Sequence, residues 1–196
     1  VMPLAEACEQ AGLPEDVAPT LGRMLFGSDG SFRLRPHQAS ALIQSLRPVD
    51  GKPHVVITSG TGSGKTESFL LPVLARLLAE GREWSTPPPV HRWWAPGPSA
   101  PWRSARDGFG RPAAVRTIVF YPTNALVEDQ ISRLRRALKA LRTPAGAPML
   151  FFGRYTGGTL GSQKAPRRTD ERRAQEVATQ LRDMERAIDQ LATLDE

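Results

Sequence analysis

Cysteine is scarce in this chain of 196 residues, which contains a single thiol, Cys8. One thiol cannot form an internal disulfide, and it cannot supply the several cysteine ligands of a structural zinc site. We therefore expect Cys8 to be a small apolar residue, buried or half-buried. This use of cysteine fits a reducing compartment, and we expect a cytoplasmic protein.

Long hydrophobic runs are also absent. No apolar stretch approaches the roughly 20 residues that a membrane span needs, and residues 1–10 lack the basic and apolar regions of a secretory signal. The sequence thus predicts no membrane partner. The first residue is Val and not Met, which leaves two interpretations: an unusual start, or a chain that begins inside a longer one.

Acidic residues are outnumbered by basic ones. The chain has 26 lysines and arginines against 20 aspartates and glutamates, a net charge of +6, and arginine supplies 22 of the basic residues. An excess of basic groups favours polyanionic partners, because binding releases counterions. A GC-rich coding sequence, which raises arginine, alanine, proline and glycine together, explains the same composition equally well.

Short apolar runs alternate with amphipathic stretches in the central part of the chain. Residues 55–58, 115–121 and 149–152 are β-branched or apolar runs typical of buried strands. Apolar residues at helical spacing predict helices around them. Such alternation indicates an α/β fold in which helices flank a parallel sheet. The central helices that we expect start near Pro36 and span residues 67–78 and 125–141.

Composition divides the chain into three parts. Residues 1–31 are predicted to form a helical extension, residues 32–160 the central domain, and residues 161–196 a charged linker and helix. The central domain carries an insertion at residues 81–112, which holds all four tryptophans and seven prolines. We expect a surface loop whose tryptophans pack on the domain. Stacking of its aromatic side chains on unpaired bases and partial disorder are the alternatives.

Residues 59–66 read Ser-Gly-Thr-Gly-Ser-Gly-Lys-Thr, the pattern of a phosphate-binding loop. Glycines let the backbone turn sharply and direct N–H groups at a triphosphate, and the following helix directs its positive end at the same anion. Lys65 can reach the β- and γ-phosphates, and the Thr66 hydroxyl can ligate Mg²⁺. The sequence therefore predicts ATP or a close relative, with Mg²⁺, as ligands. The candidate binding residues of the loop are Gly60, Thr61, Gly62, Ser63, Gly64, Lys65, Thr66 and Glu67.

Gln38 is a second candidate, 27 residues before Lys65 and at the start of an expected helix. Its side-chain amide can donate and accept hydrogen bonds together, so it can read the N7 and N6-amino edge of adenine. This reading favours ATP over GTP. A solvent-facing glutamine without a role is the alternative.

The segment from Tyr121 to Gln130 is a third candidate. A strand is expected to end there, Pro122 to start a turn, and Thr123 or Asn124 to cap the next helix. These groups would lie at the carboxyl edge of the sheet, where ligands bind in open α/β folds. They suit a nucleic-acid phosphate, and plain helix capping is an equally good interpretation.

Together these three segments resemble the Q motif, motif I and motif Ia of superfamily 2 DEAD/DEAH-box helicases. The form of residues 121–130, Tyr-Pro-x-x-Ala-Leu-x-x-Asp-Gln, is most similar to the bacterial branch related to the YprA and Lhr helicases. It is also similar to helicases of phage-defence islands such as the DpdJ type. Residues 152–159 resemble the glycine-containing segment near motif Ib. The resemblance covers residues 32–160.

The resemblance implies a RecA-like P-loop domain in an ATP-dependent helicase that acts on single-stranded DNA or RNA, with DNA favoured. Lys65 and Thr66 would be catalytic, Thr66 would hold the Mg²⁺, and Gln38 would bind ATP through its adenine. The residues implied in nucleic-acid binding are Thr123, Asn124, Thr156 and Gly157.

An acidic motif II is missing from the sequence. Members of the family use it to hold Mg²⁺ and polarise water, and they take arginines from a second RecA-like domain. We therefore expect an incomplete first RecA-like domain that lacks its carboxyl-terminal helicase domain, binds nucleotide weakly and hydrolyses almost none. The alternatives are a P-loop ATPase that does not act on nucleic acid, and a nucleotide-dependent interaction module.

Overall fold

The computed structural model divides the chain into two compact units. The first combines residues 1–86 with residues 114–152, and the second combines residues 87–113 with residues 153–196. The described residues are 1–52, 54–60, 62–84, 91–97, 101, 103–104, 108, 114–141, 150–156 and 171–192, without the side chains of residues 188, 189, 191 and 192.

The first unit starts with two helices that are preceded by one short strand and followed by another. Its elements in chain order are β1 (Met2–Pro3), α1 (Leu4–Gln10), α2 (Val17–Phe26) and β2 (Arg33–Leu34). The strands pair antiparallel, with Met2 opposite Leu34. Leu4, Leu21 and Leu34 are fully buried. The strand pair thus joins the amino terminus to the segment that leads into the next helix.

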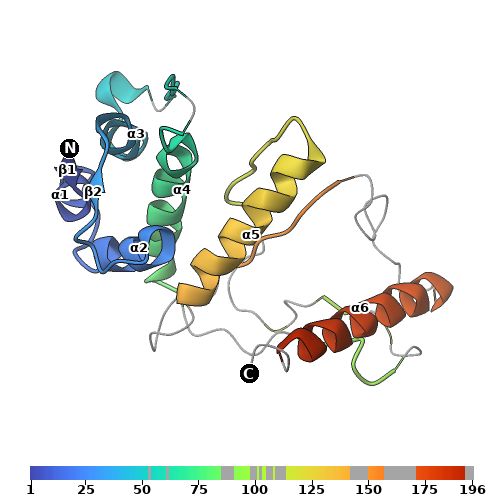
Figure 1. Cartoon of the computed structure of the whole chain (residues 1–196). Helices are drawn as coiled ribbons and strands as arrows, with labels where there is room; N and C mark the ends of the chain where they lie inside the picture. The colour runs from blue at the N-terminus through green and yellow to red at the C-terminus, as the bar shows by residue number, and fades with distance from the viewer. Residues whose placement is uncertain are drawn as a thin grey trace. The chain divides into compact units, whose positions relative to one another are not determined.

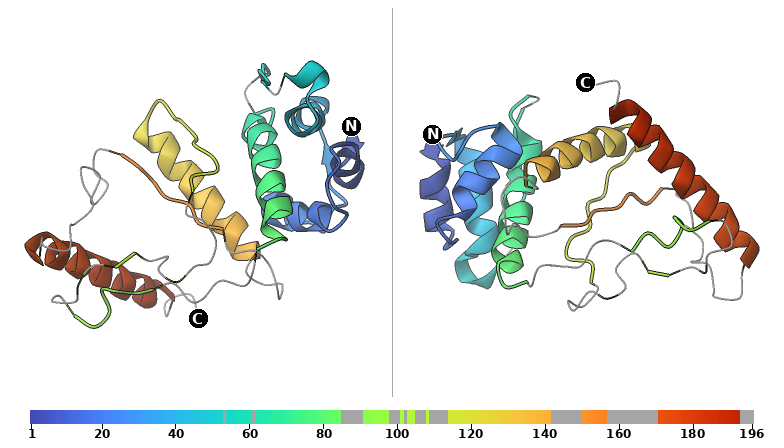
Figure 2. Two further views of the ribbon diagram at one scale, coloured as in Figure 1. Left: turned by 180° about the vertical axis from the view of Figure 1, so that it is seen from behind. Right: turned by 90° about the horizontal axis from the view of Figure 1, so that it is seen from below.

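Three longer helices complete the first unit, with a short 3-10 turn, η1 (Val49–Gly51), after the first of them. They are α3 (Pro36–Leu46), α4 (Lys65–Gly81) and α5 (Asn124–Leu141). Figures 1 and 2 show α4 between α3 and α5. Each helix buries an apolar stripe in a shared core, which includes Leu42 of α3, Leu71 of α4 and Leu141 of α5. The three helices predicted from residue spacing are confirmed.

Cys8 lies in this core, with 2% of its surface exposed. Burial raises the pKa of the thiol to about 11, from an ordinary value of 9.0. The thiolate is the reactive form of cysteine, so Cys8 is chemically inert at neutral pH. The expectation of a small buried apolar residue is confirmed.

The predicted parallel sheet is not confirmed. Residues 55–58, 115–121 and 150–152 run through the structure as irregular backbone, and residue 149 lies outside the described part. Within that part, the sheet consists of β1 and β2 alone and is antiparallel. An apolar β-branched run favours an extended backbone, but a strand also needs a neighbour to accept and donate its hydrogen bonds. The local sequence predicts the first property and not the second.

The side chains of these segments are also more exposed than those of buried parallel strands. Val56, Ile118 and Phe120 are 88%, 66% and 87% exposed. Strands of a parallel sheet are ordinarily covered on both faces. These segments therefore keep the apolar composition of buried strands without being covered by the described residues.

The second unit contains α6 (Glu171–Ala192), which confirms the predicted charged helix. Trp93 is 4% exposed and packs with Ala174 and Ala178, while Trp94 is half-buried with its ring edge-on to Trp93. Arg92 donates two hydrogen bonds to the Glu185 carboxylate, both at 2.7 Å. These bonds lower the pKa of Glu185. No helix in the described part of the chain has the length and apolar character needed to span a membrane.

The packing of Trp93 contradicts the alternative in which that side chain stacks on unpaired bases. Its indole is covered by α6, so it offers no free face to a base. Trp94 remains partly accessible, and Trp102 lies outside the described residues. We expected the tryptophans of the insertion to pack on the central domain, whereas Trp93 packs on α6, outside the range predicted for that domain.

Replacing Trp93 with alanine should therefore weaken the second unit without weakening single-strand binding. Removal of a buried indole costs about 3 kcal/mol of unfolding free energy, because the small alanines of α6 cannot fill the space. Hydrogen exchange should show faster exchange along α6 in Trp93→Ala and unchanged exchange there in Trp84→Ala, a tryptophan of the first unit. A loss of oligonucleotide affinity with α6 unaffected would support base stacking instead.

Candidate nucleotide-binding site

The glycine-rich loop bends where its glycines allow. Gly62 has a φ of 72° and Gly64 a φ of 80°, both in the left-handed region that favours glycine. Gly64 is the residue before α4, so the loop leads directly into the first turn of that helix. A side chain at Gly60 or Gly62 would point into open space. Thr61, one of the predicted binding residues, lies outside the described part of the chain.

Lys65 lies against its own loop. Its Nζ donates to the backbone oxygens of Ser59, at 2.8 Å, and of Gly60, at 2.7 Å. Within the same turn, the hydroxyls of Ser59 and Ser63 are 2.6 Å apart. The lysine is exposed, so its ammonium group can exchange these carbonyls for a stronger, anionic acceptor.

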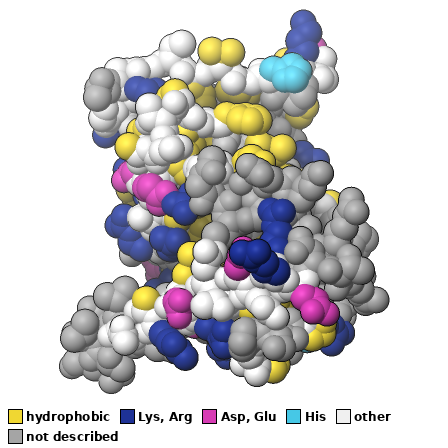
Figure 3. All heavy atoms as spheres, turned by 90° about the vertical axis from the view of Figure 1, so that its right-hand side faces the viewer, with side chains coloured by type: hydrophobic (Ala, Val, Ile, Leu, Met, Phe, Trp, Pro, Cys, Tyr) yellow, Lys and Arg dark blue, Asp and Glu magenta, His cyan; other side chains and the backbone are white. Residues whose placement is uncertain are grey.

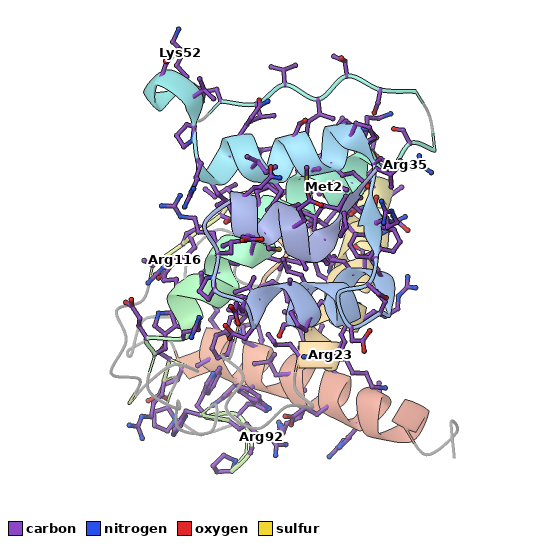
Figure 4. All side chains as sticks on the ribbon, turned by 90° about the vertical axis from the view of Figure 1, so that its left-hand side faces the viewer. Met2, Arg23, Arg35, Lys52, Arg92 and Arg116 are labelled. Carbon is purple, nitrogen blue, oxygen red and sulfur yellow. The ribbon has the colours of Figure 1, made fainter. Side chains whose placement is uncertain are left out.

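Three residues at the start of α3 bind three consecutive backbone oxygens of the loop. Arg35 Nη1 donates to Gly62 at 3.2 Å, His37 Nε2 donates to Ser63 at 3.0 Å, and Gln38 Nε2 donates to Gly64 at 3.2 Å. We refer to Arg35, His37 and Gln38 as the α3 latch. Pro36 starts α3 with a preset φ, which fixes the point from which the latch side chains reach the loop. Figure 4 shows the segment after Lys52 passing above α3 and turning down beside Arg35.

Gln38 is almost fully buried, at 4% exposed. Besides its bond to the Gly64 oxygen, its Oε1 accepts a hydrogen bond from the Arg35 backbone N–H at 3.0 Å. Both ends of the amide therefore contact the protein, and these two bonds leave one N–H of Nε2 and one lone pair of Oε1 unused. Gln38, which was predicted to read adenine, thus lies against the phosphate loop. The sequence missed Arg35 and His37 as loop partners, although both stand beside Gln38 at the same helix start.

The first turn of α4 carries the remaining loop residues. Thr66 and Glu67 are half-buried there. Ser68, fully buried, donates from its hydroxyl to the Gly64 oxygen at 3.3 Å. Glu67 accepts a hydrogen bond from Arg133 of α5 at 3.0 Å. The turn is thus attached to the loop on one side and to α5 on the other.

Thr123 caps α5, as the sequence predicted. Its Oγ1 accepts a hydrogen bond from the Leu126 backbone N–H at 3.4 Å, and its carbonyl accepts one from Val127 at 3.3 Å. Asn124 is the first residue of the helix, and both residues are exposed. Thr156 is half-buried in the second unit, and Gly157 lies outside the described residues. Thr123 and Asn124 thus belong to the first unit, and Thr156 belongs to the second.

Basic side chains do not form one continuous patch on the face drawn in Figure 3. Lys and Arg side chains are interspersed there with Asp and Glu. Several arginines of the first unit are paired, including Arg82 with Asp16 and Arg116 with Glu80. In the described residues, His, Cys, Asp and Glu form no cluster of three or more that could hold a metal ion.

A glycine-rich loop that ends in Lys-Thr at the start of a helix defines the P-loop class of nucleotide-binding domains. The family model of the DEAD/DEAH box helicases matches residues 35–173. The chain belongs to this family, which confirms the resemblance drawn from its motifs. Membership implies a RecA-like P-loop fold.

One relative is the Druantia protein DruE of Escherichia coli (strain UMEA 4076-1). The two sequences are 37% identical over 141 residues, which are 69% of this chain and 6% of DruE. The chain therefore spans only a small part of the length of this relative. No solved structure matches the chain significantly.

Proposed function

We propose that this chain binds ATP with Mg²⁺ and contacts a nucleic-acid strand, as the ATP-binding part of a helicase or translocase. The observation that carries the proposal is the α3 latch, which fixes three consecutive carbonyls of the phosphate loop. When the carbonyl oxygens of the loop point toward α3, the N–H groups of the same peptides point the opposite way, where they can bind an anion. In the complete enzyme, ATP hydrolysis would be coupled to movement along the strand.

The loop residues fit a nucleoside triphosphate. Space is open around Gly60 and Gly62, and the exposed Lys65 ammonium already lies against the loop. In the proposed site, the glycine amides and Lys65 would bind the phosphates, Thr66 would ligate Mg²⁺, and Gln38 would read adenine. Mg²⁺ held by Thr66 would supply positive charge that partly neutralises the phosphates. Lys65 adds a second positive charge at the same place.

The exposed start of α5 is the proposed contact with a strand. Thr123 and Asn124 present a hydroxyl, an amide and the positive end of a helix, all of which suit a backbone phosphate. Thr156 and Gly157 are proposed as further contacts, and single-stranded DNA is favoured over RNA. We also propose that a second RecA-like domain supplies arginines and that acidic residues outside these 196 polarise the attacking water.

Direct binding measurements test this proposal. A fluorescent ATP analogue should bind the chain in the presence of Mg²⁺ and should be displaced by ATP more readily than by GTP. A fluorescein-labelled oligothymidylate should bind as well, and Thr123→Val should weaken its binding. If the chain bound nucleotide but no DNA or RNA, the function in strand movement would be wrong and a nucleotide-dependent ATPase or interaction module would take its place.

A further inference from the structure

A network of charged and polar side chains joins the first turn of α4 to α5. Arg133 Nη1 lies 3.0 Å from Glu67 Oε1, and its Nε lies 3.4 Å from Asp129 Oδ2. The same Asp129 oxygen accepts a hydrogen bond from Gln130 Nε2 at 2.9 Å. Arg133 therefore bridges two carboxylates, one beside the phosphate loop and one on α5. The planar guanidinium suits this role, because its donors point in fixed directions.

Two further observations place this network between the two proposed binding segments. Phe69 of α4 packs against Tyr121, with ring centroids 6.4 Å apart, and Tyr121 directly precedes the turn that leads to the Thr123 cap. Gln130 is 7% exposed, and its Oε1 is buried without a hydrogen-bond partner among the described residues. The region between α4 and α5 thus holds both an aromatic contact and a buried oxygen that has no hydrogen-bond partner among the described residues.

The bridge between Arg133 and Glu67 contributes little to stability. The two side chains are 43% and 21% exposed, and ion pairs with that access to water are largely screened. The bridge instead links two elements. Glu67 follows Thr66 directly, so Arg133 joins α5 to the residue beside the proposed Mg²⁺ ligand.

We propose that Arg133 is a positioning residue that couples strand binding at the start of α5 to the phosphate loop through Glu67. This inference rests on the proposed function, because it requires both ligands to bind. Coupling between two binding sites is reciprocal. A nucleic-acid strand that holds α5 should therefore tighten nucleotide binding by the same factor by which nucleotide tightens strand binding.

The test measures the affinity of the chain for a fluorescent ATP analogue with and without saturating oligothymidylate. We expect the wild-type affinity to rise by about fivefold or more with the oligonucleotide, at the lower end of ordinary coupling factors. Arg133→Met should reduce this factor to below about twofold, while each ligand alone binds as in the wild type. Arg133→Lys, which keeps the charge, should retain most of the factor. The exposed Arg135→Met, on the same helix, is the matched control and should leave the factor unchanged.

A double-mutant cycle identifies the partner. Glu67→Gln should lose the coupling factor as Arg133→Met does, and the double variant should lose no more than either single one. A wild-type chain that binds both ligands independently, or an Arg133→Met variant with full coupling, would overturn the inference and leave the proposed function standing. If the wild-type chain bound neither ligand, both proposals would be overturned.

Discussion

Replacing Lys65 with alanine is expected to weaken ATP binding by about 100-fold or more while the fold stays intact. A charge-assisted hydrogen bond contributes about 1.5–3 kcal/mol, and an ammonium group placed between two phosphates makes more than one. In the structure, the Lys65 ammonium donates hydrogen bonds to the Ser59 and Gly60 carbonyls, and the side chain is exposed. Water can replace it at those carbonyls, so we expect the free energy of unfolding to change by less than about 0.5 kcal/mol.

Isothermal titration with Mg-ATP measures the first effect, and thermal unfolding measures the second. Lys52→Ala is the matched control, because Lys52 is an exposed lysine that precedes the loop. It should leave both quantities unchanged. ATP affinity in Lys65→Ala within twofold of the wild type would refute the role given to Lys65.

Replacing Gly64 with alanine should impair both the loop and the fold. Gly64 has a φ of 80°, and a Cβ there would lie 2.5 Å from Gln38 Nε2 and 3.1 Å from Glu67 Oε2. The left-handed backbone alone costs an alanine about 1–2 kcal/mol. Because Gln38 is buried, it cannot withdraw into solvent, and its bond to the Gly64 oxygen should break. We expect a loss of at least 1 kcal/mol in unfolding free energy and a loss of more than about tenfold in ATP affinity.

Gly27→Ala separates the two causes. Gly27 ends α2 with a φ of 65°, and a Cβ there would meet nothing within 4 Å. This variant should show the cost of the left-handed backbone without a collision, and it should bind ATP normally. If Gly64→Ala were no more destabilising than Gly27→Ala and bound ATP equally well, the contact between Gln38 and the loop would have no structural importance.

The helices could be predicted from the sequence because their signals are local. Apolar spacing places α3 and α5 within a residue or two, and Pro36 and Thr123 mark their starts. The glycine bends of the phosphate loop were also predictable, since a left-handed φ at Gly62 and Gly64 depends on the residue itself.

The remaining features depend on contacts between distant residues. Arg35 and His37 bind loop carbonyls 26 or 27 positions away, and nothing in their own neighbourhood specifies those partners. The same reason explains why the predicted parallel sheet is not confirmed. Residues 55–58 and 115–121 have the composition of strands, but they have no paired neighbour in the described structure. Trp93 is a further example, since only the packing of α6 shows which surface covers it.

The most direct test of the account is ATP hydrolysis by the full natural form of the protein, assayed with and without single-stranded DNA or RNA. The proposed function predicts hydrolysis that rises when nucleic acid is added and that disappears in Lys65→Ala. Hydrolysis at the same rate with and without every nucleic acid tested would contradict the proposed function in strand movement.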